Sequence, residues 1–316
     1  MRKFTLLFAL SALLLFLAAC GDSEDGNTDK DAASEDKQET MTVEHELGKT
    51  DVAKNPEKVV VFDFGTLDSL DKLGIEVAGV PKGNIPTYLE KYEGDDYENV
   101  GSLKEPDFEK IAEVDPDLII ISGRQSELYD QLQDIAPTIY LGVDTTRYMD
   151  SFKENLATIG EVFDKETEVE EELDEIEDAI SELKEEAEAS DKNSLIILAN
   201  DDKISAYGPN SRFGLIHDVF GVPAVDDTIE ASTHGMNVSF EYVTEQDPDL
   251  LYVIDRSAVV DGESSAKQVV ENKLMEKTKA YKNDDIIYLD PNYWYLSGGG
   301  LESVSEMIDE VSESLK

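Results

Sequence analysis

One stretch of this chain occurs twice, and the duplication constrains the fold more than any other feature. The first copy runs from Asp107 to Arg124 and the second from Ser239 to Arg256. In each copy a Phe precedes an Asp-Pro-Asp triplet by seven residues, an apolar run follows, and an Arg stands eight residues after the Pro. This order predicts a helix, a turn and a buried strand. We therefore expect two similar lobes, each with an arginine at the end of a strand.

Arginine is rare in this chain, which makes the repeated pair informative. Of 27 basic residues only five are arginines. Arg124 and Arg256 are equivalent in the two copies, and Arg212 lies in a loop before a predicted helix of the second half. A guanidinium is flat, permanently charged and suited to several hydrogen bonds with one anion. Facing lobes with these arginines predict an anion-binding cleft; ion pairing with the 72 acidic residues is the alternative for any single arginine.

The N-terminus has the plan of an export signal. Arg2 and Lys3 precede an apolar run, Phe4–Leu17, that is too short to cross a membrane. The sequence Leu-Ala-Ala-Cys that ends at Cys20 resembles a bacterial lipobox, so we expect a signal peptide over 1–19 and lipidation of Cys20. The alternative is an ordinary signal peptide in which the cysteine is incidental. Because Cys20 is the single cysteine, a disulfide within the chain is impossible. The acidic segment 20–40 is expected to be a disordered tether.

The net charge is −45, and loss of the two basic residues of the signal would make it −47. Such a charge repels nucleic acid and argues against the body of the protein lying on an anionic membrane. Contact with the membrane is therefore expected through the lipid anchor alone, and we expect a monomer.

Apolar runs alternate with amphipathic segments along both halves, which predicts an α/β fold. We expect two Rossmann-like lobes with mostly parallel sheets, 41–163 and 193–316, joined by one long helix within 164–192. On that helix a narrow apolar stripe recurs in steps of three and four residues. It favours a strut across both lobes over a coiled-coil pairing helix. The predicted strands are 58–62, 77–80, 118–122, 138–141, 195–198, 203–207 and 286–289, and the other predicted helices are 66–73, 126–135, 149–163, 213–220, 265–273 and 301–315.

Two further segments carry candidate site residues. Tyr293-Trp294-Tyr295 follows a predicted strand and precedes Gly298-Gly299-Gly300. These rings are interpreted either as core packing or as a cleft wall on which a flat ligand stacks. His234 lies in a polar loop before the second copy, where histidines are usually just exposed to solvent.

Four motifs together resemble the catecholate siderophore-binding proteins of ABC iron importers, over residues 41–316. They are residues 120–126 around Arg124, 205–214 around Arg212, 233–235 around His234, and 289–296 around Tyr295. The resemblance implies the class III periplasmic-binding-protein fold, with a rigid pair of lobes, little closure, and a ferric catecholate siderophore in a shallow cleft. It implies no intrinsic cofactor, and an ABC permease with its ATPase as partners, on the outer face of a Gram-positive cell membrane.

The resemblance also assigns roles to residues. Arg124, Arg212 and Arg256 match the arginines around the anionic iron–catecholate core. His234 and Tyr295 match a pair that fills iron positions left open by tetradentate catecholates; imidazole and phenolate are both suitable ligands of ferric ion. Glu109 and Glu241, at equivalent positions of the two copies, match glutamates that engage permease arginines, and solvated helix surface is the alternative.

Other classes of protein fit the sequence less well. Motifs of hydrolases, dinucleotide enzymes and zinc proteases are absent from the sequence. A receptor for bare zinc or manganese would need converging histidines and carboxylates rather than arginines. A haem or cobalamin receptor would share the fold but not these motifs, and a purely structural lipoprotein would leave the duplicated lobes without a purpose.

Overall fold

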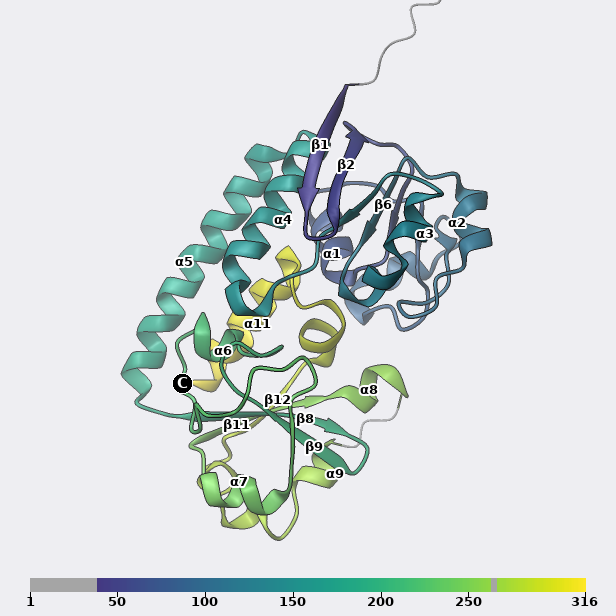
Figure 1. The fold of residues 1–316 in the computed structure, drawn as a ribbon. Coiled ribbons are helices and arrows are strands. Elements are labelled where there is room, and N and C mark those ends of the chain that lie inside the picture. Colours follow the sequence, from purple (N-terminus) through teal and green to yellow (C-terminus); the bar gives the residue numbers. More distant parts are fainter. Residues whose placement is uncertain (1–38, 263–265) are drawn as a thin grey trace, which may run out of the picture. The chain divides into compact units, whose positions relative to one another are not determined.

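Most strands of the first sheet are short apolar runs, as the sequence predicts, and the edge strand β5 is polar and exposed. A computed structural model describes residues 39–262 and 266–316 (Figure 1). In it five parallel strands form a sheet in the order β5-β4-β3-β6-β7. Strands β3 and β6 are buried along their whole length, which suits a parallel sheet covered on both faces. The strands are β3 (Val59–Val61), β4 (Gly79–Val80), β5 (Glu98–Asn99), β6 (Leu118–Ile121) and β7 (Thr138–Tyr140).

Helices connect these strands. The first begins after Asp63, whose carboxylate accepts a hydrogen bond from the Thr66 amide at 2.8 Å. The helix predicted over 126–135 is instead a 3-10 turn followed by five α-helical residues, because Ser122 and Gln125 cap each other and start the turn at Gly123. The segments are α1 (Phe64–Lys72), η1 (Thr87–Glu93), α2 (Phe108–Val114), η2 (Gly123–Leu128), α3 (Tyr129–Gln133), η3 (Thr145–Arg147) and α4 (Tyr148–Phe163).

The duplicated stretch has the same conformation in both copies. Helices α2 and α7 (Phe240–Gln246) each have seven residues, and each ends at an aspartate with a positive φ, 53° at Asp115 and 46° at Asp247. Aspartate is one of the residues that visit this left-handed region. Each helix leads to a buried strand, β6 or β11, and then to an arginine. The predicted helix, turn and strand are confirmed twice, and Asp107 caps α2 by accepting from the Lys110 amide at 3.1 Å.

The second sheet is mixed, in the order β10-β9-β8-β11-β12. Strands β8, β11 and β12 are parallel to one another, and β9 is antiparallel to both of its neighbours, β8 and β10. The predicted strands 195–198 and 203–207 are β8 and β9, and they form a hairpin with Asp201-Asp202 at its turn. The elements are β8 (Ser194–Asn200), β9 (Lys203–Tyr207), α6 (Leu215–Asp218), β10 (Met236–Val238), β11 (Leu250–Asp255), α8 (Arg256–Val260), α9 (Ala266–Val270), η4 (Met275–Lys277), α10 (Lys279–Lys282), β12 (Ile286–Leu289) and η5 (Asn292–Ser297).

One long helix, α5 (Glu166–Ser190), connects the lobes, as predicted (Figure 1). Its apolar stripe is the buried side and packs against α4 and α11 (Leu301–Ser314) of the same chain. A single apolar core runs from the first sheet through these three helices to the second sheet. A shared core resists hinge motion because interiors are close-packed, so the expectation of little closure on binding has a structural basis.

The junction of α1 and α11 explains Gly300, the last residue of the glycine triplet. A side chain at Gly65 would lie 2.3 Å from the Ser297 carbonyl oxygen, and one at Gly300 would lie 2.4 Å from the Asp68 carboxylate. Asp68 accepts hydrogen bonds at 2.8 Å from the amides of Glu302 and Ser303, which begin α11. The first lobe thus caps the C-terminal helix, and the glycines permit the close approach.

Several short elements lie outside the apolar runs on which the prediction of strands and helices rests. A two-stranded hairpin, β1 (Thr40–His45) and β2 (Gly48–Ala53), precedes the first lobe, and its short polar strands lack the apolar runs used for prediction. Strand β10 is mostly exposed, and its polar sequence predicts a loop instead of a strand. The helix predicted over 213–220 contains only four helical residues, since the segment before it folds into a tight loop against Gly214.

All described residues belong to one compact unit. The predicted signal peptide, Cys20 and almost the whole acidic tether lie outside the described residues. None of the helices in the part of the chain that the structure describes is long and apolar enough to cross a membrane.

Candidate ligand-binding site

Arg256 is the first residue of α8, directly after β11. Its Nε donates to the Tyr295 hydroxyl at 3.0 Å, and one terminal nitrogen donates to the Asn200 side-chain oxygen at 2.6 Å. Asp255 caps the helix by accepting from the Ala258 amide at 3.2 Å. The guanidinium is therefore fixed from two sides, while part of it remains open to solvent, with 23% of the side chain exposed.

The far end of α8 is held by the other lobe. The Asn84 side-chain nitrogen donates to the carbonyl oxygens of Val259 at 2.6 Å and Val260 at 3.2 Å. These carbonyls are the free acceptors at the end of a helix. The short helix that carries Arg256 is thus tied at its start by its own strand and at its end by the first lobe.

Arg212 contacts both the ring and the backbone of Tyr295. Its guanidinium carbon is 4.3 Å from the centre of the Tyr295 ring and 5.2 Å from that of Phe213. One terminal nitrogen donates to the Tyr295 backbone oxygen at 2.7 Å. Stacking on aromatic faces holds a guanidinium without neutralising its charge. Tyr295 is therefore the common support of two arginines.

Arg124 lies in η2 on the first lobe, three residues past the end of β6, and is exposed. Its turn is anchored by the buried Gln125, whose side-chain nitrogen donates to the Leu103 carbonyl. Burial, and next the positive charge of Arg124, lower the pKa of Arg212. Arg124 of one lobe is thus within electrostatic range of Arg212 of the other.

The two arginines of the second lobe change the chemistry of Tyr295. Burial alone would raise the pKa of its phenol, but the charges of Arg212 and Arg256 and their hydrogen bonds outweigh burial, so the pKa is lowered. A more acidic phenol forms phenolate more readily, and phenolate is a hard oxygen donor. The cluster of Arg212, Arg256 and Tyr295 can therefore hold an anion and offer a ligand to a ferric ion.

His234 lies in a loop next to that of Arg212, but the hydrogen bonds of Arg212 and Arg256 described above go to other residues. Its imidazole is exposed, and its backbone amide donates to the Ser232 hydroxyl at 3.1 Å. The Ser232 carbonyl accepts from the Arg212 amide at 3.4 Å, so the two loops lie side by side. The role of His234 as an iron ligand stays a prediction. In residues 39–262 and 266–316 no group of three or more His, Cys, Asp or Glu side chains is arranged to hold a metal ion.

Trp294 does not fit the role of a cleft wall. Its side chain is only 4% exposed, and its indole nitrogen donates to Glu310 of α11 at 2.6 Å. The core-packing interpretation describes its place, whereas the neighbouring Tyr295 is only partly buried. Trp294 is therefore a residue of the core and not a wall of the cleft.

Glu109 and Glu241 occupy the second position of α2 and α7, and both are exposed. The fold places them on equivalent helices of the two lobes. Hydrogen bonds from the local backbone, and next from Ser239, lower the pKa of the Glu241 carboxyl. Docking itself stays a prediction.

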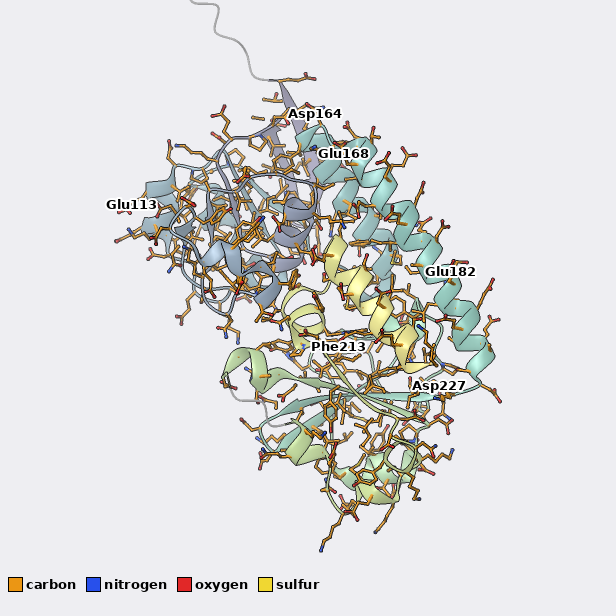
Figure 2. The ribbon with its side chains drawn as sticks, turned by 180° about the vertical axis from the view of Figure 1, so that it is seen from behind. Glu113, Asp164, Glu168, Glu182, Phe213 and Asp227 are labelled. Carbon is orange, nitrogen blue, oxygen red and sulfur yellow. The ribbon has the colours of Figure 1, made fainter. Side chains whose placement is uncertain are left out.

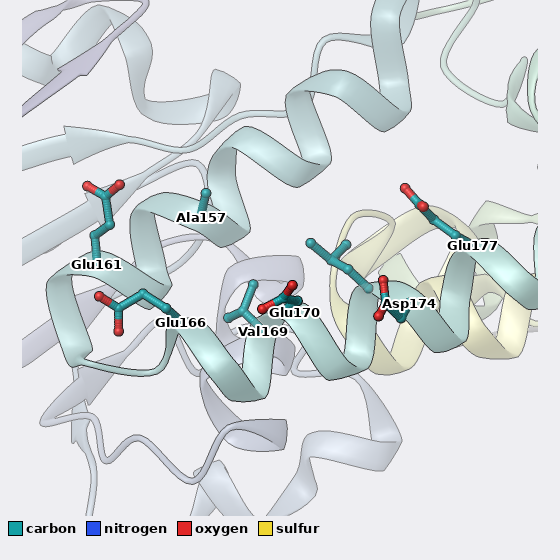
Figure 3. A pocket seen from close by; sticks show the side chains of 8 residues that line it. Ala157, Glu161, Glu166, Val169, Glu170, Asp174 and Glu177 are labelled. Atoms are coloured by element: carbon teal, nitrogen blue, oxygen red, sulfur yellow. The ribbon is translucent and has the colours of Figure 1, made fainter.

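Two hollows lie elsewhere on the molecule. One, of about 310 Å³ between α4 and α5, is lined by Val169 and Leu173 and has an acidic rim, of which Figure 3 labels Glu161, Glu166 and Glu177. The other, of about 490 Å³, is lined by residues including His45, Asp144, Arg147 and Glu154. Neither hollow is lined by Arg124, Arg212 or Arg256, the three arginines called the arginine cluster below. Acids such as Glu113, Asp164, Glu168 and Glu182 stand out over the whole surface, so an acidic rim alone distinguishes nothing (Figure 2).

Sequence reasoning missed the residues that hold the arginines. Asn200, Asn84 and Phe213 each contact a site arginine or its helix. Asn200 ends β8 and Asn84 stands in a loop with φ 63°, and neither belongs to a motif. Only the adjacency of Phe213 to Arg212 was visible in the sequence.

Comparison with known proteins identifies the family and the fold of this chain. The model of the family described as periplasmic binding protein matches residues 59–293. The chain is 55% identical over 320 residues to the petrobactin-binding protein YclQ of Bacillus subtilis (strain 168), with both chains fully covered. The crystal structure of YclQ superposes with a TM-score of 0.87 at 58% identity, covering 88% of this chain and 99% of that one. The periplasmic catecholate-siderophore binding protein VctP from Vibrio cholerae superposes with a TM-score of 0.83 at 37% identity, covering 87% and 100%. This chain belongs to the periplasmic binding protein family.

Proposed function

We propose that this protein captures ferric catecholate siderophores of the petrobactin type and delivers them to an ABC permease for iron uptake. The observation that carries the proposal is the arginine cluster: Arg212 and Arg256 are both fixed on Tyr295, and Arg124 of the other lobe is within electrostatic range. The names of YclQ and VctP, a petrobactin-binding and a catecholate-siderophore binding protein, support the same ligand class. It is a binding protein and not an enzyme, and its iron is cargo rather than a cofactor.

The charge of the ligand matches the cluster. Three catecholates around one ferric ion form a trianion, and each charge-assisted hydrogen bond to a guanidinium is worth about 1.5–3 kcal/mol. Three arginines drawn from two lobes bind such a flat-faced anion without a deep apolar pocket. Salt screens the distant acids of the surface more than these short contacts.

The roles of Tyr295 and His234 depend on how many positions the siderophore fills. A hexadentate chelator occupies the iron completely, and then the two side chains make no bond to it. A tetradentate catecholate leaves two positions, for which the acidic phenol of Tyr295 and the exposed imidazole of His234 are candidates. The test is to bind a ferric tetradentate catecholate to wild type, to Tyr295→Phe and to His234→Ala, and to compare the charge-transfer spectra of the three complexes. An unchanged spectrum in both variants excludes ligation.

The ligand assignment is tested by titrating the protein with ferric catecholates, ferric hydroxamates and haem, followed by quenching of intrinsic fluorescence. Selective binding of catecholates is expected. A preference for hydroxamates or haem would overturn the assignment, and a preference for haem would favour the alternative of haem or cobalamin transport.

The arginines have a matched control within the chain. Arg147 is paired with Glu154 at 2.9 and 2.6 Å and with Asp144 at 3.4 Å, so its charge is already compensated. Replacement of Arg124, Arg212 or Arg256 by Gln is expected to weaken ferric catecholate binding by about ten- to 150-fold each. Arg147→Gln is expected to leave binding unchanged. Equal effects at all four positions would mean that overall charge, and not the cluster, governs binding.

Delivery to the permease is assigned to Glu109 and Glu241. Their equivalent positions on α2 and α7 give one exposed carboxylate per lobe, and a carboxylate can pair with an arginine of the permease. The double charge reversal to Lys is expected to abolish uptake and to leave siderophore binding intact. Glu113→Lys with Glu245→Lys, later on the same two helices, is the control. Loss of binding, or uptake that persists, contradicts the assignment.

The proposed location is the outer face of the cell membrane of a Gram-positive bacterium, with a lipid on Cys20 as the anchor and a monomeric body. Replacement of Cys20 by Ser is expected to release the protein into the medium, which fractionation and immunoblotting would detect. Retention in the membrane fraction would rule out lipidation as the anchor.

A further inference from the structure

The arginines of the cluster differ from Arg147 in the kind of oxygen that holds them. Arg147 is held by two carboxylates. The hydrogen bonds of Arg212 and Arg256 go to neutral oxygens: the Tyr295 backbone carbonyl, the Tyr295 hydroxyl and the Asn200 amide. In a chain with 72 acids and 27 basic residues, a carboxylate would be the commoner partner for an arginine.

Asn200 makes the shortest of these contacts. Its side-chain oxygen lies 2.6 Å from a terminal nitrogen of Arg256, and it ends β8, the strand beside β11 in the sheet. The nearest step of the ladder pairs Asp255 with Ala199, so Asn200 is fixed by the sheet next to the arginine. A carboxylate, Asp261, lies 3.7 Å from the same guanidinium, beyond hydrogen-bond distance, with 53% of its side chain exposed. Exposed pairs of this kind contribute little.

We propose that Asn200 is a positioning residue of the siderophore site, which orients Arg256 with a neutral acceptor and so keeps its positive charge free for an anionic ligand. The proposal rests on the proposed function. An amide oxygen fixes the direction of the guanidinium fork, which matters because bidentate contacts require planar alignment. A carboxylate at the same place would fix the fork equally well but would neutralise it and repel the incoming trianion. The choice of amide over acid therefore sets the preference of the site for highly charged chelates.

Two variants separate orientation from charge. Asn200→Ala removes the acceptor and adds no charge, and a loss of about three- to tenfold in affinity for a ferric tris-catecholate is expected. Asn200→Asp keeps an acceptor and adds a negative charge beside Arg256, and a larger loss is expected at low salt. That loss should shrink between about 0.01 M and 1 M salt, as the screening length falls from about 30 Å to about 3 Å. It should also be smaller for ferric chelates of lower net charge.

The matched control is Asn283→Asp. Asn283 is exposed at the end of α10 and precedes β12, so it lies at the amino end of a strand that is parallel to β8, away from the edge where Asn200 and Arg256 stand. The substitution Asn283→Asp adds the same charge to the molecule as Asn200→Asp, and it is expected to leave the affinity for the chelate and its salt dependence unchanged. Thermal unfolding of each variant reports whether the fold is intact.

The outcomes are distinct. Affinity of Asn200→Ala within twofold of wild type, or a loss in Asn200→Asp that is independent of salt and of chelate charge, would overturn the positioning role. The same salt-dependent loss in Asn283→Asp would assign the effect to overall charge and overturn it as well. If the wild-type protein failed to bind ferric tris-catecholates, the proposed function itself would be refuted. The results with the variants bear only on the role of Asn200.

Discussion

The buried carboxylate of Asp68 links the first lobe to the C-terminal helix, and its replacement by Asn gives a quantitative test of the structure. Asp68 is 1% exposed and accepts from the amides of Glu302 and Ser303 at 2.8 Å and from the Tyr88 hydroxyl at 2.9 Å. Burial raises the pKa of this carboxyl from 3.8 to about 6, although the three donors oppose the shift.

The sign of the pH effect follows from the raised pKa. Between about pH 4 and pH 6 the folded protein keeps a proton on Asp68 that the unfolded chain has already released. The contribution of this proton to stability is complete below the unfolded pKa and is lost as the pH rises through the folded pKa. A shift of about 2 units at 1.36 kcal/mol per unit makes that loss about 3 kcal/mol.

Asp68→Asn removes the titration but keeps the shape. The introduced amide has one oxygen for the two helix amides, so the variant is expected to be less stable by about 1–3 kcal/mol in acid, where both side chains are neutral. As the pH rises to about 7 the wild type loses about 3 kcal/mol relative to the variant, and the difference should shrink or reverse. Urea unfolding at intervals from about pH 4 to pH 8, followed by the fluorescence of the buried Trp294, measures it.

Taking the difference between the two proteins cancels the titration of the other acids. Tyr88→Phe is the companion variant, because it removes one donor to the carboxylate and keeps the ring, whose centre lies 4.7 Å from that of Tyr293. It is expected to raise the pKa of Asp68 further and to move the pH window upward. A stability difference between wild type and Asp68→Asn that stays constant over the whole range would refute the reasoning.

Three further results are expected. Gly65→Ala should lower the free energy of unfolding by about 3 kcal/mol or more in urea titrations, because its methyl group would meet the Ser297 backbone oxygen at 2.3 Å; an unaltered midpoint would contradict the α1–α11 packing. Trp294→Phe should lower stability by about 1–3 kcal/mol through loss of the 2.6 Å bond to Glu310, yet leave siderophore affinity unchanged by calorimetry; a weakened affinity would restore this ring to the site. The ultraviolet titration of wild type minus Tyr295→Phe should show a phenol that ionises at lower pH than an ordinary tyrosine, and an ordinary curve would mean that the guanidinium groups are not beside it.

Much of the fold was readable because it depends on local patterns. Strands β9 and β12 begin and end where the apolar runs predict, and the stripe of α5 is the face that packs on α4 and α11. The shorter elements were less predictable. Strands β1, β2 and β10 are mostly polar or exposed, so they lack the apolar runs from which the other strands are predicted.

The candidate site divides in the same way. The duplication by itself determined that Arg124 and Arg256 end equivalent strands, since one repeated pattern must fold in one way, and the aspartates that end α2 and α7 bear this out. Only the tertiary structure decided how the arginines are held. Tyr295 supports two of them while its neighbour Trp294 is buried, and Asn200 and Asn84 act on α8 from 56 and 175 residues away in sequence. Hydrogen bonds between distant segments depend on the packing of whole sheets and helices, and such contacts have no period or spacing in the chain from which they could be inferred.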